Sequence, residues 1–90
     1  MYIGRVIGTV VATIKHPVFE GRKLLLVERL TPEGQGTDRY DIAVDTVQSG
    51  NGNLVLVIDE GNSARQVIHQ EEAPIRAVIV GVIDQVDIWP

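Results

Sequence analysis

The chain has 90 residues, of which 44% are apolar and 4% aromatic, and it carries a formal charge of -4 with no cysteine. A chain this short forms one domain, here residues 1–90, and buries only about 60 to 65% of its unfolded surface by itself. The net negative charge and scattered basic residues argue against non-specific nucleic-acid binding, and the lack of cysteine excludes disulfides and thiolate metal sites. With no signal-peptide pattern and no apolar run near the roughly 20 residues that span a bilayer, we expect a cytoplasmic protein.

Five strands are predicted in chain order from alternating apolar side chains and from runs of Val, Ile and Leu. They cover residues 2–14, 23–30, 39–48, 53–59 and 75–89. In the first strand, Gly4 and Gly8 share the face predicted to point inward, and glycines there favour a bend in a long strand. Asn51 and Gly52 stand between the third and fourth strands, and this dipeptide is a strong hairpin signal.

One short helix is predicted between the fourth and fifth strands. Ser63 and Gln66 have the spacing of a capping box, and Pro74 stops the segment soon after His69. Five strands with one short helix predict a mainly β protein, a small closed barrel of the Greek-key type.

Three of the predicted strands are apolar on both faces, because they contain the runs LLLV, LVLVI and AVIVGVI. A small antiparallel barrel whose exterior is solvated shows alternating apolar and polar residues instead. One short helix is too small to cover three strands, and a large exposed apolar surface is a liability for a soluble monomer. The pattern therefore predicts that other copies of the same chain cover the outside of the barrel.

The glycine-rich segment from Ser49 to Gly52 has the look of a ligand-binding loop. A P-loop needs a second glycine followed by lysine and serine or threonine, and a dinucleotide fingerprint needs a third glycine that opens a helix. Val55 breaks both patterns. We interpret the segment as a hairpin turn or pore-lining backbone rather than a nucleotide site.

Asp45 lies among apolar residues of a predicted strand, so its carboxylate needs a partner if it is buried. Arg65 or a loop amide is a natural partner, and a structural ion pair is favoured over a catalytic acid. The chain offers no nucleophile paired with a base, and His69 beside Glu71 and Glu72 is an ordinary surface cluster. We therefore expect no catalytic residue, no cofactor and no metal site.

Four segments carry a resemblance when they are taken in order: GRVIGTVVAT, GRKLLLVERL, IAVDTVQSGNGNLVLVIDEGNSAR and AVIVGVIDQVDIW. Together they resemble the EutN/CcmL family of bacterial microcompartment vertex proteins, and the match runs over nearly the whole chain. The resemblance implies a five-stranded OB-like barrel that assembles into a cyclic homopentamer. It further implies a structural, non-enzymatic shell protein, related to those of carboxysomes, that caps the fivefold vertices of a microcompartment in the cytoplasm.

The partners implied by the resemblance are hexameric and pseudohexameric shell proteins, with neither nucleic acid nor membrane. On the same basis, Ser49, Gly50, Asn51 and Gly52 are expected to line a narrow axial pore. Asp45 and Arg65 are then expected to brace this loop or the contact between subunits. The alternative hypothesis is an oligomeric OB-type binding module for single-stranded nucleic acid or a small ligand, because fold alone does not separate these functions.

Overall fold

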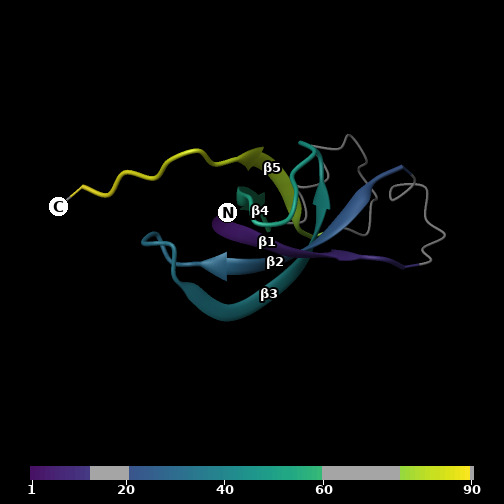
Figure 1. Cartoon of the computed structure of the whole chain (residues 1–90), viewed down its shortest axis with the longest axis horizontal. Coiled ribbons are helices and arrows are strands. Elements are labelled where there is room, and N and C mark those ends of the chain that lie inside the picture. The colour runs from purple at the N-terminus through teal and green to yellow at the C-terminus, as the bar shows by residue number, and fades with distance from the viewer. Residues whose placement is uncertain (13–20, 60–75, 90) are drawn as a thin grey trace.

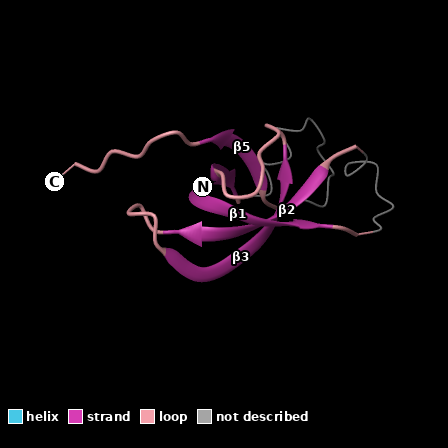
Figure 2. Ribbon diagram, in the orientation of Figure 1, coloured by secondary structure: helices cyan, strands magenta, loops and turns pink. Residues whose placement is uncertain are grey.

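The computed structural model describes residues 1–12, 21–59 and 76–89, which form five β-strands joined by loops. The strands are β1 (Tyr2–Val10), β2 (Lys23–Leu30), β3 (Gly36–Asp45), β4 (Leu54–Ile58) and β5 (Val78–Val82). They close into a barrel in the order β1-β2-β3-β5-β4, and β4 pairs back to β1 (Figures 1 and 2). Only β3 and β5 run parallel, and the other neighbours are antiparallel. The five-stranded barrel agrees with the fold predicted from the strand pattern.

The barrel is filled by alternate residues from every strand, as the two-residue period of a strand requires. These inward side chains are all small or β-branched apart from one leucine. The core cluster comprises Val6, Leu25, Val27, Ala43, Val55, Val57, Ala77 and Ile79. Each of these side chains is almost fully buried.

Gly4 on β1 shows why the first strand needs glycine on its inner face. A Cβ atom placed at Gly4 would collide with Cγ1 of Val27, whereas one at Gly8 would meet Cβ of Leu26 at an ordinary 3.8 Å. The pairing of β1 with β2 shifts register between Val6 and Gly8, so Ile7 is an extra residue on β1. A bulge of this kind bends a strand and increases its twist, which places the bend near Gly8, one of the two predicted positions.

The helix is the part of the predicted fold class that is wrong. The described residues contain only strands, turns and loops, so the barrel is all β with no helix within those ranges (Figure 2). The segment that suggested the helix, residues 63–69, lies outside the described residues, and Arg65 and His69 lie outside them too. A capping box marks where a helix would begin, but about two turns are too short to be stable without packing. A capping box on its own is therefore weak evidence for a helix.

Two further details differ from the sequence-based expectation. Asn51 and Gly52 do form a turn, but the turn does not join a hairpin, because β5 lies between β3 and β4 in the barrel. The Asn51–Gly52 pair indicates that the chain reverses direction locally, but it does not indicate which strands pair on either side of the turn. The fifth strand is also shorter than predicted, since β5 ends at Val82 and residues 83–89 continue without strand structure.

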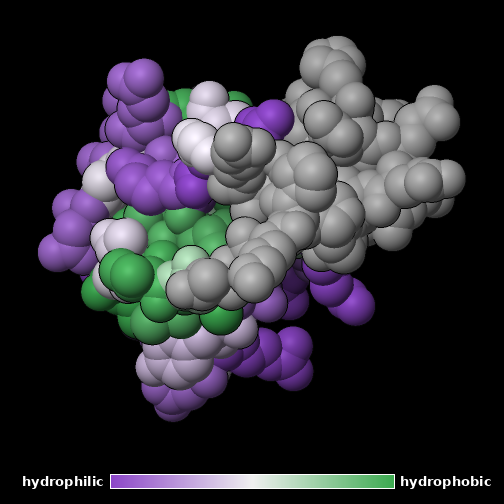
Figure 3. All heavy atoms as spheres, turned by 90° about the vertical axis from the view of Figure 1, so that its right-hand side faces the viewer, coloured by the Kyte–Doolittle hydropathy of each residue, from purple (hydrophilic) through white to green (hydrophobic). Residues whose placement is uncertain are grey.

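The outer face of the barrel is apolar, as the unbroken apolar runs predicted. Its partly exposed members on β2, β4 and β5 are Leu24, Leu26, Leu54, Leu56, Ile58 and Val80. Figure 3 shows an apolar patch bordered by polar side chains at the end of the barrel that lies on the right in Figure 1. Such a surface is expected where another protein surface packs. Within the described ranges, no helix is long and apolar enough to cross a membrane.

Candidate functional site

The loop between β3 and β4 is held by a buried carboxylate at the end of β3. Asp45 is 8% exposed and Ser49 is 1% exposed. Oδ1 of Asp45 accepts hydrogen bonds from Oγ of Ser49 at 2.8 Å and from the backbone N–H groups of Val47 and Ser49, both at 3.2 Å. The loop thus folds back onto the strand that precedes it, and the carboxylate satisfies donors that would otherwise be buried without partners.

Lys23 supplies the positive charge next to this carboxylate. Its Nζ donates to the carbonyl oxygen of Ser49 at 2.7 Å and lies 3.6 Å from Oδ2 of Asp45. Lys23 and Asp45 face each other across the β2–β3 ladder, so strand pairing sets their distance. Arg65, the partner considered for Asp45 from the sequence, lies outside the described residues.

The tip of the loop is a tight turn from Gly50 to Asn53. The backbone N–H of Asn53 donates to the carbonyl of Gly50 at 3.0 Å, and Oδ1 of Asn53 accepts from the N–H of Gly50 at 2.7 Å. Gly52 has a φ of 87°, a conformation that strongly favours glycine. Hydrogen bonds between Val6 and residues Gly52 and Asn53 tie the turn to β1. Asn51 and Gly52 are exposed at its tip.

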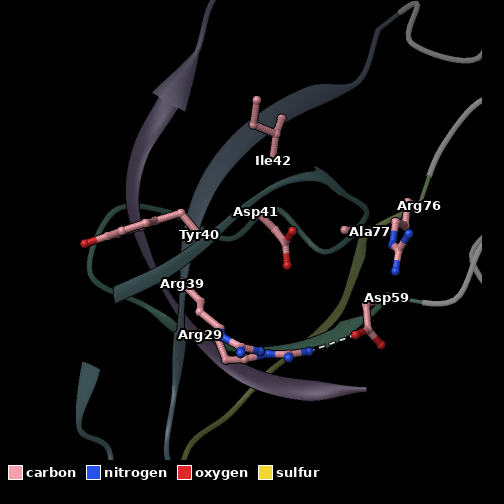
Figure 4. A pocket seen from close by; sticks show the side chains of 8 residues that line it. All are labelled: Arg29, Arg39, Tyr40, Asp41, Ile42, Asp59, Arg76 and Ala77. Carbon is pink, nitrogen blue, oxygen red and sulfur yellow. Dashed lines mark hydrogen bonds and ion pairs between the residues drawn. The ribbon is translucent and has the colours of Figure 1, made fainter. Parts of the chain in front are cut away.

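A second feature, not predicted from the sequence, is an open cavity of about 550 Å³ beside β3. Three of the residues that line it are arginines from separate parts of the chain. The lining residues are Arg29, Arg39, Tyr40, Asp41, Ile42, Asp59, Arg76 and Ala77 (Figure 4). No local motif marks them, because β2, β3 and the segments that follow β4 and precede β5 meet only in the folded barrel.

One wall of this cavity is a network of polar side chains. The hydroxyl of Tyr2 donates to Oδ2 of Asp41 at 2.7 Å, and NH2 of Arg29 donates to Oδ2 of Asp59 at 2.8 Å. The guanidinium of Arg29 also lies over the ring of Tyr2, 4.1 Å from its centroid, in a cation–π contact. Nε of Arg29 is buried and has no hydrogen-bond partner among the described residues. The network therefore joins β1, β2, β3 and the end of β4.

Two groups in this network have shifted pKa values. Burial raises the pKa of the Tyr2 hydroxyl well above its usual range, and the hydrogen bond to Asp41 adds to this effect. The pKa of Asp59 is lowered, chiefly by a hydrogen bond from the amino group of Met1 and further by the charges of Met1 and Arg29. Both shifts hold these groups in the protonation states in which they make their contacts at neutral pH. They serve the network and supply no acid or base poised near pH 7.

The described residues present an apolar outer face, a braced loop and an arginine-lined cavity. Ser49 is the only serine within the described residues, and its hydroxyl donates a hydrogen bond to Asp45. In the part of the chain that the structure describes, no three carboxylate or histidine side chains come together as a metal site. An apolar outer face of this kind is typical of a surface that packs against another protein.

Comparison with known proteins identifies the kind of assembly. Residues 1–84 match the family described as "Ethanolamine utilisation protein EutN/carboxysome". The bacterial microcompartment shell vertex protein GrpN of Rhodospirillum rubrum is 45% identical over 87 residues, covering 97% of each chain. The carboxysome shell vertex protein CcmL of Gloeobacter violaceus is 42% identical over 88 residues, covering 98% of this chain and 87% of the relative.

A solved structure agrees with these sequence matches. The pentameric microcompartment shell protein GrpN superposes with a TM-score of 0.87 at 45% identity, covering 99% of this chain and 100% of the other. The chain belongs to the EutN/CcmL family.

Proposed function

We propose that this chain is a structural shell protein that forms a cyclic homopentamer and caps the fivefold vertices of a bacterial microcompartment. The observation that carries the proposal is the apolar outer face of the barrel on β2, β4 and β5, which a single chain leaves partly exposed. Relatives that align over nearly the whole chain at 42% and 45% identity are vertex proteins of such shells, and one is a pentamer. In a cyclic ring two different faces of each subunit are buried, so an extensive apolar exterior is required.

The work of such a subunit is geometric. A sheet tiled by sixfold units stays flat, and it closes into a shell only where fivefold units introduce curvature. The partners of the pentamer are accordingly hexameric and pseudohexameric shell proteins, which meet its outer rim. The proposed function needs no catalytic residue and no cofactor.

We further propose that the loop of Ser49, Gly50, Asn51 and Gly52, whose base at Ser49 is buried and whose tip at Asn51 and Gly52 is exposed, lines a narrow passage at the axis of the ring. Support comes from the way the turn is built: Asp45 and Lys23 hold its base rigidly, while Asn51 and Gly52 project from the barrel. Gly50 has a negative φ, and a Cβ atom placed there would meet no heavy atom closer than Oδ1 of Asn53, 3.8 Å away. Nothing in the described part of its own subunit requires glycine there, whereas five loops meeting at an axis would require a small residue.

The first experiment is native mass spectrometry of the purified chain over a range of concentrations. A pentamer supports the proposal, and a stable monomer overturns it. The second step is co-expression with hexameric shell proteins, with electron microscopy of the products. Closed shells that become open or elongated when this chain is omitted are the expected result. Tight binding of labelled single-stranded nucleic acid at physiological salt would favour the alternative binding module instead.

A further inference from the structure

The segment after β5 leaves the barrel as an extended chain. Its last backbone hydrogen bond to the barrel joins the N–H of Ile83 to the carbonyl of Leu54 at 2.8 Å. Beyond this point, residues 84–89 run away from the body of the molecule (Figure 1). Val86, Ile88 and Trp89 are 39%, 57% and 84% exposed, so the segment carries three large apolar side chains that its own subunit leaves partly or mostly uncovered.

The first half of β3 offers an open strand edge. On one side, the strand pairs with β2 from Gly36 to Asp45. On the other side, only Val44 and Asp45 pair with β5, so residues 36–42 have no strand partner there within the described chain. This stretch also contributes four residues to the arginine-lined cavity. An unpaired edge of this length is a template for an added strand.

The side chains of the two segments match in spacing. Tyr40 and Ile42 lie two residues apart on β3 and are 53% and 56% exposed. Val86 and Ile88 have the same spacing in the extended segment. Since alternate residues of paired strands share a face, adding the segment to β3 would bring these two apolar pairs onto one surface.

The charges match as well. Arg39 and Arg76 line the cavity and have no carboxylate partner within salt-bridge distance among the residues described. In Figure 4 the side chain of Arg39 points toward Arg29, and the side chain of Arg76 points into the same cavity. Asp84 and Asp87 in the extended segment likewise have no basic partner in the described part of the chain, and Asp87 accepts only from Gln85, at 2.7 Å.

The register excludes pairing within one subunit. In the parallel β3–β5 ladder, Val44 lies opposite Val78 and Asp45 opposite Ile79. Residues after Ile79 therefore proceed past the carboxyl end of β3, away from the open stretch at residues 36–42. The segment and the open edge of one chain therefore lie on different parts of the subunit, which is the relationship that a heterologous contact in a ring needs.

We propose that residues 84–89 of one subunit add as a strand to the open edge of β3 in the adjacent copy. Asp87 alternates with Val86 and Ile88, so it lies on the other face of the added strand and meets Arg39 and Arg76 of that copy. This inference rests on the proposed pentamer, because a closed ring lets every subunit both give and receive one segment. Backbone hydrogen bonds supply much of the contact, the two apolar pairs bury their exposed surface, and the charges fix which partner is accepted.

The test is a charge exchange measured by native mass spectrometry at fixed protomer concentrations. One variant carries D87R, a second carries R39E and R76E, and a third carries all three changes. Each of the first two variants places like charges at the contact, so the protomer concentration at which half the rings dissociate is expected to rise about tenfold. The triple variant restores opposite charges and is expected to return this concentration to the wild-type range.

The matched control reverses the exposed charges of Arg5 and Glu33, which lie outside both segments. It is expected to leave the ring unchanged, and circular dichroism with thermal melting checks that every variant folds. If the wild-type chain is not a pentamer, the proposed function itself fails. If the wild type is a pentamer and the first two variants are equally stable, or the triple variant fails to recover, this inference alone is overturned.

A truncated chain that ends at Ile83 provides a second readout that does not depend on charge. It keeps β5 and the hydrogen bond of Ile83, so the barrel is expected to fold while the ring weakens. If truncation leaves the pentamer intact but prevents co-assembly with hexameric shell proteins, the segment binds a facet protein and the inference of a second copy is wrong.

Discussion

The hydroxyl of Ser49 donates to the carboxylate of Asp45 at 2.8 Å, and both side chains are almost completely buried. This contact connects the end of β3 to the start of the exposed turn. An Asp45→Ala substitution removes three hydrogen bonds at once and leaves the Ser49 hydroxyl and two backbone N–H groups without their acceptor. We expect it to lower the free energy of unfolding by about 2 to 3 kcal/mol.

The companion substitution Ser49→Ala removes only one of these bonds and is expected to cost about 1 kcal/mol. Urea denaturation at one fixed protomer concentration measures both values, since the stability of an oligomer depends on concentration. Glu33→Gln in the exposed turn after β2 is the control and should change little. Equal costs for the two substitutions would show that the carboxylate does not hold the loop.

Gly4 and Gly8 provide a matched pair of glycines on one strand. Alanine at position 4 would place its methyl group against Val27 and within 3.0 Å of the carbonyl oxygen of Glu28, whereas at position 8 the nearest atom is 3.8 Å away. We expect Gly4→Ala to cost about 1 to 3 kcal/mol through overpacking, and Gly8→Ala to change stability by less than about 1 kcal/mol. Thermal unfolding measures both. A Gly8→Ala variant that is the less stable of the two would contradict the assignment of Gly4 to the crowded contact.

Asp59 is expected to make stability depend on acid pH. Its pKa in the folded state is lowered, chiefly by the hydrogen bond from the Met1 amino group. The folded state then binds its proton less readily than the unfolded state, so the stabilisation is present above the unfolded pKa of about 4 and is lost as pH falls through the lower folded value. Wild type should exceed Asp59→Asn in stability at pH 5 to 7, and the difference should shrink below pH 4. Denaturation midpoints that differ by a constant amount down to pH 3 would argue against this linkage.

The two glycines of the exposed turn are expected to respond differently to alanine. Gly52 has a φ of 87°, so Gly52→Ala strains the subunit itself by about 1 kcal/mol. Gly50→Ala meets no close contact among the described residues of the subunit and should leave its unfolding unchanged. If five copies of the turn meet at the axis, Gly50→Ala and the bulkier Gly50→Leu should progressively reduce the pentamer fraction in native mass spectra. Full retention of the ring by Gly50→Leu would place the turn away from the axis.

The sequence pattern was sufficient to predict a strand where that strand pairs with a neighbouring strand on each side. The predicted strand at residues 23–30 coincides with β2, which pairs along most of its length with both β1 and β3. It was insufficient at residues 75–89, where the β-branched residues predict a long strand but β5 covers only Val78–Val82. A strand is defined by its partner, and residues 83–89 have none within the described chain.

The two candidate sites also differ in how far the sequence alone could reveal them. The Ser49–Gly52 loop and Asp45 are visible in the sequence because a tight turn and a carboxylate in an apolar strand both leave local signals. Lys23 was missed as the cation beside Asp45, since the two are paired only across the β2–β3 ladder. The cavity was missed altogether, because Arg29, Arg39 and Arg76 are brought together by strands that meet in no short stretch of sequence.

The sequence by itself determined the strand-rich composition, the alternation that fills the barrel, and the apolar exterior that requires neighbours. These follow from the two-residue period of strands and from the free energy of removing apolar surface from water, both of which are local properties of the chain. Tertiary structure decided the order β1-β2-β3-β5-β4, the open edge of β3 and the gathering of arginines beside it. Strand order and register depend on which distant segments close the barrel with the least loss of packing and hydrogen bonds, and no local pattern encodes that comparison.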